Sequence, residues 1–356
     1  MQFLSRAIIS CVLPWFLFSL AGCGCAELDY ACYAVGGELQ LLASAVPIED
    51  GLTDTSLTDD EREKLELVIE ARDYAADVVG LNVASSYQTF VNFHGEPMAW
   101  NLSASAKDAI EAYTWTLPFV GEIAYLGYFD LDRATVERDR LVSEGYDTMI
   151  YEVDAFSTLG LLPDPVSSSL FRRAVHSLVD TVFHELLHNT IWTGRDVVFD
   201  ESLAVFVGRT AGMEFLEQRF GADSEQVQQA REKYEDTDRF NAFLDELRVE
   251  LETLYNSPLS REEKIEARQP IFDTASQRLG DEILPTLHYP ETYEQFTTTT
   301  FNNAFMLVNV RYHTDFELFE AVFDKAGRDW GEALSVFSQA AGVADPFAYL
   351  ATFLEE

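Results

Sequence analysis

The chain has 356 residues, 47% of them apolar, which is enough to bury a sizeable core in one large domain or two closely packed lobes. Its 61 acidic and 24 basic side chains give a net charge of -37. This charge argues against electrostatic binding to DNA, RNA or an anionic membrane surface, so nucleic-acid functions are set aside.

Residues 1–22 have the pattern of a bacterial export signal. Arg6 precedes an apolar stretch that ends in Leu20-Ala21-Gly22-Cys23. The stretch is shorter than the roughly 20 residues that span a bilayer, and Pro14 interrupts it, so a permanent transmembrane helix is disfavoured. The last four residues resemble a lipobox. This resemblance implies cleavage before Cys23, a lipid on the Cys23 thiol, and, with Gly24 next, a place on the periplasmic face of the outer membrane.

Cys25 and Cys32 are the cysteines that remain beside the lipidated one in the exported chain. An oxidising compartment permits a disulfide between them. A mobile tether behind the anchor would instead leave Cys25 unpaired. The sequence leaves both arrangements open.

Helical patterns dominate the first part of the exported chain. Residues 28–46 are predicted as a helix, and a polar break follows. At Thr58 a capping pattern with Asp59 and Asp60 precedes apolar residues at helical spacing. The sequence therefore predicts a second helix that ends near Gly80.

The periodicity changes in the middle third of the chain. Residues 121–129 alternate as a strand, residues 130–144 form a charged amphipathic helix, and residues 147–156 have the pattern of a second strand. This order predicts a strand, helix, strand unit.

A break at Pro163-Asp164-Pro165 separates this unit from the next helix. Serines at positions 167–169 are candidate caps for a helix that runs to about Trp192. Gly194 makes the turn out of it, and Asp200 is a candidate cap for another helix. From there to the C-terminus the pattern is mostly helical.

The strongest functional signal is His184-Glu185-Leu186-Leu187-His188, inside the helix predicted before Trp192. Residues four apart share one helical face, so His184 and His188 can direct two imidazole nitrogens at one tetrahedral Zn²⁺. Glu185 would lie beside the water that the metal activates, where it can accept a proton as general base.

Glu201 is the predicted third metal ligand. A helix, turn, helix hairpin can fold it back against the histidine pair, which gives the His, His, Glu set of gluzincins. Asp200 is its nearest rival, and both acids can also simply favour a helix start. Metzincins are disfavoured, because they place a third histidine shortly after the second and none follows His188 there.

Several residues outside the motif are candidates for supporting roles. Asp180 lies one turn before His184 and either orients it or is an exposed acid on a helix, and the exposed acid is favoured. The oxyanion that forms during hydrolysis needs a donor, for which Tyr312 and His313 are the preferred pair. Ordinary packing remains the alternative for both. Further candidates for the donor are Arg311, His288, Tyr289 and Tyr293.

The chain resembles the predicted bacterial aminopeptidases, many of which look like lipoproteins. The resemblance rests on an ordered set of segments that spans nearly all of the exported chain: the lipobox, residues 117–121, 125–129 and 155–160, Asp164-Pro165, the histidine motif, residues 199–204 and residues 302–304. Phe156, Asp200 and Leu187 stand where the family pattern has Tyr, Asn and Ala.

The resemblance implies that residues 151–160 form a sheet edge that holds an extended peptide by main-chain hydrogen bonds. The name aminopeptidase rests on the resemblance alone, because no residue stands out in the sequence as the acidic partner of a free amino terminus.

Together these features predict an α+β, zincin-like fold in one peptidase domain at residues 23–356. A mixed sheet region near residues 117–160 would be followed by the active helix and a mostly helical C-terminal part. The predicted activity is that of a zinc-dependent peptidase, lipid-anchored in the cell envelope, whose partners are a peptide substrate and the membrane. Two alternatives remain: a lipid-anchored zinc-binding scaffold or assembly factor without turnover, and a non-enzymatic lipoprotein whose motif arose by chance.

Overall fold

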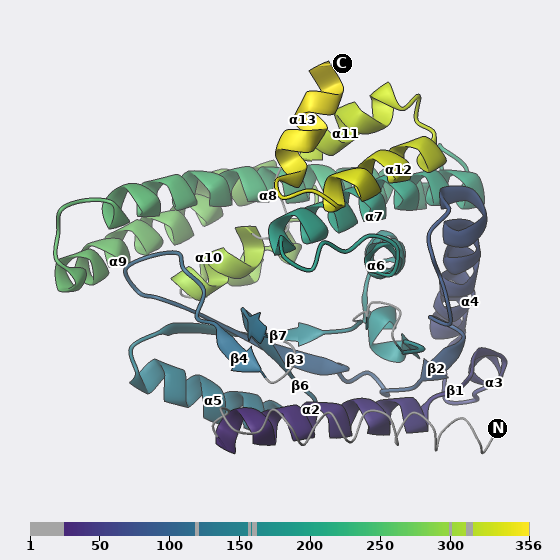
Figure 1. The fold of residues 1–356 in the computed structure, drawn as a ribbon, viewed down its shortest axis with the longest axis horizontal. Helices are drawn as coiled ribbons and strands as arrows, with labels where there is room; N and C mark the ends of the chain where they lie inside the picture. The colour runs from purple at the N-terminus through teal and green to yellow at the C-terminus, as the bar shows by residue number, and fades with distance from the viewer. Residues whose placement is uncertain are drawn as a thin grey trace.

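The computed structural model describes residues 25–117, 121–155, 158, 162–298, 301–310 and 316–355 (Figure 1). The expected signal at residues 1–22, the lipidation candidate Cys23 and the oxyanion candidates Tyr312 and His313 lie outside the described residues. Within the described ranges, no helix combines the length and the apolar character needed to cross a membrane.

The main sheet has three strands in the order β6-β3-β7. The central strand is β3 (Ala99–Ser105), which pairs antiparallel with β6 (Tyr125–Tyr128) on one side and with β7 (Asp147–Val153) on the other. Helix α5 (Leu131–Ser143) links the two outer strands, so the predicted strand, helix, strand unit is present. Both outer strands oppose β3 and therefore run parallel to each other.

The sheet buries one face against α5. Leu102 of β3 and Leu126 of β6 pack with Ala134 and Leu141 of the helix in one apolar cluster. Asp130 starts the helix by accepting a hydrogen bond from the Asp132 amide at 2.8 Å. The opposite face of the sheet is left for the upper helical layer.

Residues 121–129 do not form the single strand that the alternation predicted. The chain breaks at Ala124 into β5 (Gly121–Ile123) and β6, because the two halves pair with different strands. Strand β5 joins β4 (Trp115–Leu117) in a separate two-stranded sheet. A third small sheet has the order β1-β2-β8 and consists of β1 (Val46–Pro47), β2 (Thr89–Val91) and β8 (Val166–Ser167).

The N-terminal helices are α2 (Cys25–Ser44), α3 (Ile48–Leu52) and α4 (Asp59–Tyr74). Thr58 caps α4 as predicted: its hydroxyl accepts from the Glu61 amide at 3.2 Å, and the Glu61 carboxylate accepts from the Thr58 amide at 2.8 Å. A π-helical turn (Ala75–Val79) extends α4 to Gly80, where φ is +84°. The predicted end of this helix is thus confirmed.

The positions of Cys25 and Cys32 in helix α2 exclude a disulfide between them. Residues seven apart on a helix are separated by about 10 Å along its axis, which is too far for a disulfide. Cys25 and Cys32 both belong to α2, and Cys32 is a free, exposed cysteine. Of the two arrangements that the sequence left open, the disulfide is therefore excluded.

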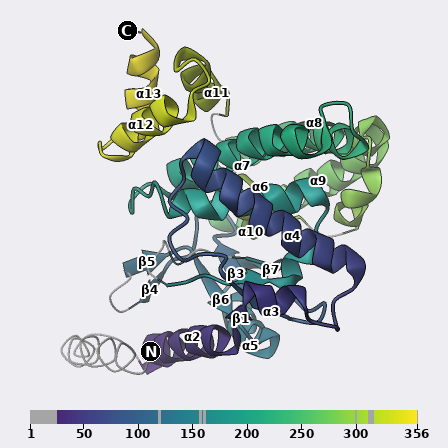
Figure 2. The same cartoon turned by 90° about the vertical axis from the view of Figure 1, so that its right-hand side faces the viewer.

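The remaining helices form an upper layer over the sheet, as Figures 1 and 2 show from two sides. Its elements are α6 (Val175–His188), α7 (Val197–Phe220), α8 (Glu225–Tyr255), α9 (Arg261–Arg278), α10 (Asn303–Val310), α11 (Phe316–Lys325), α12 (Trp330–Ala341) and α13 (Pro346–Glu355). Helices α8 and α9 form a long hairpin to one side, and α11, α12 and α13 lie above α7, while α2 and α5 lie on the far side of the sheet.

The helix that carries the histidine motif begins later than the sequence predicted. Ser167 caps a short 3₁₀ turn (Ser168–Arg172), and α6 starts only at Val175. Arg172 ends this turn, and Arg173 follows it with an extended backbone. Both arginines bond to the carboxylate of Asp154, just beyond β7. These ion pairs fix the chain in a conformation that interrupts the helix.

Helices α6 and α7 pack unusually closely, which fixes the site between them. A Cβ atom added at Gly208 of α7 would lie 2.9 Å from the carbonyl oxygen of Asp180 on α6. At Gly212 it would lie 2.6 Å from the Asp180 carboxylate. The two glycines therefore allow a backbone approach that any side chain would prevent.

Candidate metal centre

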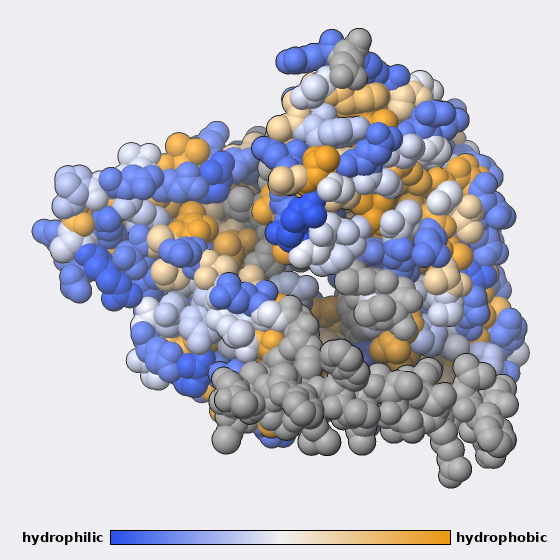
Figure 3. All heavy atoms as spheres, in the orientation of Figure 1, coloured by the Kyte–Doolittle hydropathy of each residue, from blue (hydrophilic) through white to orange (hydrophobic). Residues whose placement is uncertain are grey.

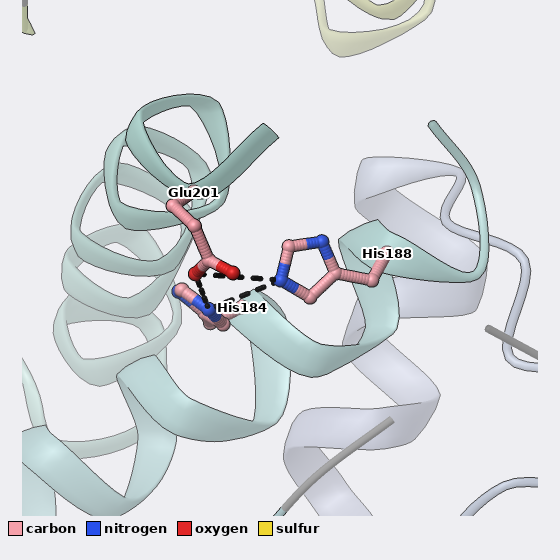
Figure 4. Close-up of side chains that lie close together, drawn as sticks. All are labelled: His184, His188 and Glu201. Atoms are coloured by element: carbon pink, nitrogen blue, oxygen red, sulfur yellow. Dashed lines mark hydrogen bonds and ion pairs between the residues drawn. The ribbon is translucent and has the colours of Figure 1, made fainter. Parts of the chain in front are cut away.

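Three side chains from α6 and α7 point at one another (Figure 4). The Nε2 atoms of His184 and His188 are 3.2 Å apart. The Oε2 atom of Glu201 lies 3.2 Å from Nε2 of His184 and 3.8 Å from Nε2 of His188. Among the residues that the structure describes, these three form a group that could hold a metal ion.

The turn between the two helices brings Glu201 to the histidines. Gly194 adopts φ +69°, and Asp196 caps α7 by accepting from the Phe199 amide at 3.0 Å. Asp200 is therefore not the cap that the sequence suggested, because α7 has already begun at Val197. Its carboxylate instead accepts from the amide and hydroxyl of Thr193, at 2.9 and 2.7 Å. Asp200 thus braces the turn, which leaves Glu201 to face the histidines.

The spacing of the three atoms fits a tetrahedral ion. With zinc to nitrogen bonds of 2.0–2.1 Å, two ligand nitrogens of a tetrahedral site lie about 3.3 Å apart. The observed separation of the imidazole nitrogens, 3.2 Å, agrees with this value. Two imidazoles and one carboxylate are also the donor set of catalytic zinc sites with one open position. The residues therefore fit such a metal.

Burial and neighbouring charges shift the pKa values of Glu201 and His188. Glu201 is 8% exposed and His188 is 6% exposed. Burial raises the pKa of Glu201, but the bonds from His184 and His188 outweigh burial and hold this pKa well below its usual range. Burial lowers the pKa of His188, and the bond and charge of Glu201, together with the charge of Glu185, more than reverse that effect. A carboxylate is thus kept ionised beside two imidazoles.

Glu185 lies next to His184 in α6 and is distinct from the three converging residues. It lines the same cleft as they do, but it is not a member of the group that could hold an ion. Burial raises the pKa of Glu185, and the negative charges of Glu201 and Asp164 add to this against the opposing effect of the histidines. A carboxyl group of raised pKa next to a metal group is suited to accept and release a proton.

The group opens into a cleft of about 1050 Å³ between the upper helices and the sheet. Its walls come from α6 and α7 on one side, from β3, β6 and β7 on the other, and from α2 at the end. Figure 3 shows this face of the molecule hollowed near its centre, between the helices above and the sheet layer below. Tyr151, Glu152 and Val153 of the outer strand β7 line the cleft.

Asp180 is neither the exposed acid nor the partner of His184 that the sequence suggested. Its carboxylate accepts a hydrogen bond from the hydroxyl of Tyr234 on α8 at 2.6 Å. Burial raises the Asp180 pKa to about 7, while Tyr234, Arg209 and Arg173 oppose the shift. His176, one turn earlier, packs against the Tyr234 ring, and burial lowers its pKa to about 4.

The candidates for an oxyanion donor that the structure describes do not line the cleft. Arg311, Tyr312 and His313 lie outside the described residues. His288 contacts Glu235, Tyr289 bonds to Glu232, and Tyr293 contacts Thr237. His288 and both tyrosines are therefore placed away from the converging side chains.

Sequence reasoning missed several charged residues of the cleft, among them Arg173 and Glu38. Arg173 precedes α6 and reaches forward along it, with Nη1 at 3.3 Å from the hydroxyl of Thr181, one turn before Glu185. Glu38 belongs to α2, far away in the sequence. The closeness of Arg173 to the motif could have drawn attention to it, whereas no local pattern marks Glu38.

Comparison with protein families gives one match that covers most of the chain. The model of the family described as "Putative aminopeptidase" matches residues 29–345. Neither the curated proteins nor the solved structures contain a match. The matched range includes both helices of the candidate metal centre, and the chain therefore belongs to this family of aminopeptidases.

Proposed function

We propose that this protein is a zinc-dependent peptidase of the gluzincin type that acts at the amino termini of peptides. The convergence of His184, His188 and Glu201 within a cleft that Glu185 also lines carries this proposal. Membership of an aminopeptidase family supports the reaction class. The arrangement of sheet, motif helix and helical C-terminal part would then be a variant of the zincin-like fold.

Zinc is the proposed ion because of the donor set. Two imidazole nitrogens and one carboxylate oxygen suit Zn²⁺, and three protein ligands leave a position that faces the cleft. When bound, the ion would polarise the peptide carbonyl and lower the pKa of a water molecule. His184, His188 and Glu201 would hold it.

The chain's own residues would supply the proton transfers and the orientation of the substrate. Glu185 would take a proton from the attacking water and deliver it to the leaving amine. The free edge of β7 near Tyr151 would pair with an extended peptide through main-chain hydrogen bonds, while side chains fill the cleft. The donor for the oxyanion would be Tyr312 or His313.

The place of action is part of the proposal. The lipobox predicts that the exported chain begins at Cys23 with a lipid on its thiol, and α2 begins at Cys25. The enzyme would therefore act on peptides in the envelope, close to the membrane that holds its anchor.

Metal content and turnover test the proposal together. We would measure both in the purified protein and in His184→Ala, Glu185→Gln and Glu246→Gln. The wild type and Glu185→Gln are expected to carry about one zinc per chain and His184→Ala none, because only the last variant loses a ligand. Hydrolysis of amino-acyl amides should fall by about a hundredfold or more in Glu185→Gln.

The Glu246→Gln variant is the control, because Glu246 of α8 is exposed, bonds to Arg278 and does not line the cleft. It should keep both zinc and turnover. Full turnover in Glu185→Gln would overturn the role of the base. Zinc without hydrolysis by the wild type would instead favour the envelope scaffold, and no zinc in any of the proteins would favour a non-enzymatic lipoprotein.

A further inference from the structure

Large apolar side chains are exposed along the wall of the cleft that holds the metal group. Val35 and Leu39 of α2 are 48% and 62% exposed, and Trp192, between α6 and α7, is 38% exposed. All three line the cleft, as do the exposed Tyr125 of β6 and Leu162. Exposed apolar residues are normally scattered singly over a surface, so five along one cleft indicate a place where apolar groups bind.

Trp192 brings this apolar surface up to the metal group. Its ring packs edge-on against the imidazole of His188, with the ring centroids 5.3 Å apart. His188 is one of the three residues that could hold the ion. A substrate group held at the ion would therefore lie close to the Trp192 ring.

Helix α2 turns one face towards the cleft. The residues of this face recur at helical spacing and all line the cleft: Tyr30, Ala34, Val35, Glu38 and Leu39. The helix is held in place by the Tyr30 hydroxyl, which donates to the Gly127 carbonyl of β6 at 2.8 Å, and by Arg133 of α5, which lies over the Tyr33 ring at 4.4 Å. The face of α2 is thus a fixed part of the wall.

The charges of the wall disfavour an acidic occupant. Six carboxyl groups line the cleft: Glu38, Glu152, Asp154, Asp180, Glu185 and Glu201. Two arginines stand against them on the described wall, and both are already paired, Arg173 with Asp154 at 3.0 Å and Arg209 with Asp238 at 2.7 Å. An acidic side chain of a substrate would therefore be repelled.

We propose that Val35 and Leu39 of α2, together with Trp192, select peptides that carry large apolar side chains beside the bond to be cleaved. This inference rests on the proposed peptidase function and adds its substrate class. An apolar side chain that leaves water for this wall gains free energy in proportion to the area that it buries. A small polar side chain gains little, and an acidic one meets the carboxyl groups of the wall.

Binding to a protein that does not turn over substrate tests this selection separately from hydrolysis. We would measure the fluorescence anisotropy of Leu-Leu-Ala-Ala-Lys, Ser-Ser-Ala-Ala-Lys and Asp-Asp-Ala-Ala-Lys, each labelled on the lysine side chain, on zinc-loaded Glu185→Gln protein. The leucine peptide should bind about ten- to a hundredfold more tightly than the serine peptide, because each leucine buries apolar area that serine lacks. The aspartate peptide should bind most weakly of the three.

Variants of the wall, made in the Glu185→Gln protein, identify the residues that select. Leu39→Ser and Trp192→Ser should each lower the preference for the leucine peptide by about three- to tenfold, and Trp192→Phe, which keeps an apolar ring, should retain most of it. Val136→Ser is the matched control. Val136 of α5 is 71% exposed and is not among the described residues of the wall, so the preference should not change.

The outcomes distinguish the two proposals. Equal binding of the leucine and serine peptides, or an unchanged preference in both Leu39→Ser and Trp192→Ser, would overturn the selection while leaving zinc-dependent hydrolysis intact. Zinc content is measured in every variant, and if Trp192→Ser loses its zinc, Leu39→Ser on the separate helix α2 decides the matter. A preference for the leucine peptide beside a wild type without turnover would support the apolar wall and count against the enzyme.

Discussion

Two buried polar clusters in this protein differ in how fully their atoms are bonded. In the first, Arg268 of α9 donates both Nη atoms to the carboxylate of Asp147, at 2.6 and 3.0 Å. The Asn303 amide donates to the same carboxylate at 3.0 Å, and Tyr255 donates to the Asn303 side chain at 2.8 Å. All of this cluster's members are buried, and it ties α8, α9 and α10 to the start of β7.

The second cluster is the cleft between α6, α7 and the sheet. Here two imidazole nitrogens and a carboxylate oxygen converge, and Nδ1 of His188 is buried without a partner. Oε1 of Glu38, which also lines the cleft, is a further buried atom without a partner. The first cluster is complete in itself, which is typical of a structural role, whereas the second has bonding capacity left for a ligand.

The largest expected loss of stability comes from removing the cation of the first, fully bonded cluster. Arg268→Ala would leave the Asp147 carboxylate buried without its cation, so the free energy of unfolding should fall by about 3 to 5 kcal/mol. Urea unfolding of the wild type and the variant measures this difference in free energy. Arg278→Ala is the control, because Arg278 bonds to the exposed Glu246, and it should cost less than about 1 kcal/mol. Equal losses in both variants would contradict a structural role for the buried pair.

A smaller effect is expected from Asp180, a carboxylate beside the second cluster whose pKa is raised to about 7 by burial. The folded protein holds this proton more tightly than the unfolded chain does, so stability declines as pH rises from about 4 to about 7. Asp180→Asn cannot ionise. Between these pH values the Asp180→Asn variant should be more stable than the wild type by on the order of 2 kcal/mol. This gain is smaller than the full shift in pKa would give, because the carboxylate also reaches the cleft.

Urea titrations of both proteins at about pH 4.5, 6 and 8 check this difference. The buried His176, whose pKa is lowered to about 4, titrates over part of the same range in the opposite sense. It is common to both proteins and cancels in the comparison. A difference that does not change with pH would show that Asp180 is already compensated by Arg209 and Arg173.

The smallest expected change in stability comes from two variants, each of which loses a tyrosine hydroxyl. Tyr255→Phe removes a bonded hydroxyl and leaves an Asn303 oxygen buried, so the free energy of unfolding should fall by about 1 kcal/mol or slightly more. Tyr87→Phe removes a hydroxyl without a partner and should leave stability unchanged or slightly raised. Thermal unfolding of the two variants measures the contrast. A clear loss in Tyr87→Phe would mean that its hydroxyl is satisfied in the free protein.

Several features of the fold followed from patterns within a few residues. The capping box at Thr58, helix α5 with its cap at Asp130, and the helix that carries His184 and His188 each depend on neighbours along the chain. The position of Glu201 was also predictable, because a short turn between two helices limits where the chain can go.

Other features depended on partners that are distant in the sequence. The central strand β3 has weak alternation, and its pairing with β6 and β7 makes it a strand. The same pairing divides residues 121–129 between two sheets. The start of α6 is set by Asp154, which takes Arg172 and Arg173 out of the helix.

The sequence by itself determined the proposed metal-binding motif and the candidate base within it, because the α-helical repeat places His184, Glu185 and His188 without help from the rest of the chain. Only the tertiary structure decided which other residues share the cleft. Glu38 of α2, Tyr151 of β7 and Arg209 of α7 line it from three separate segments, and no local pattern relates them. Their places in the cleft depend on how the helices pack on the sheet, which is a property of the folded protein.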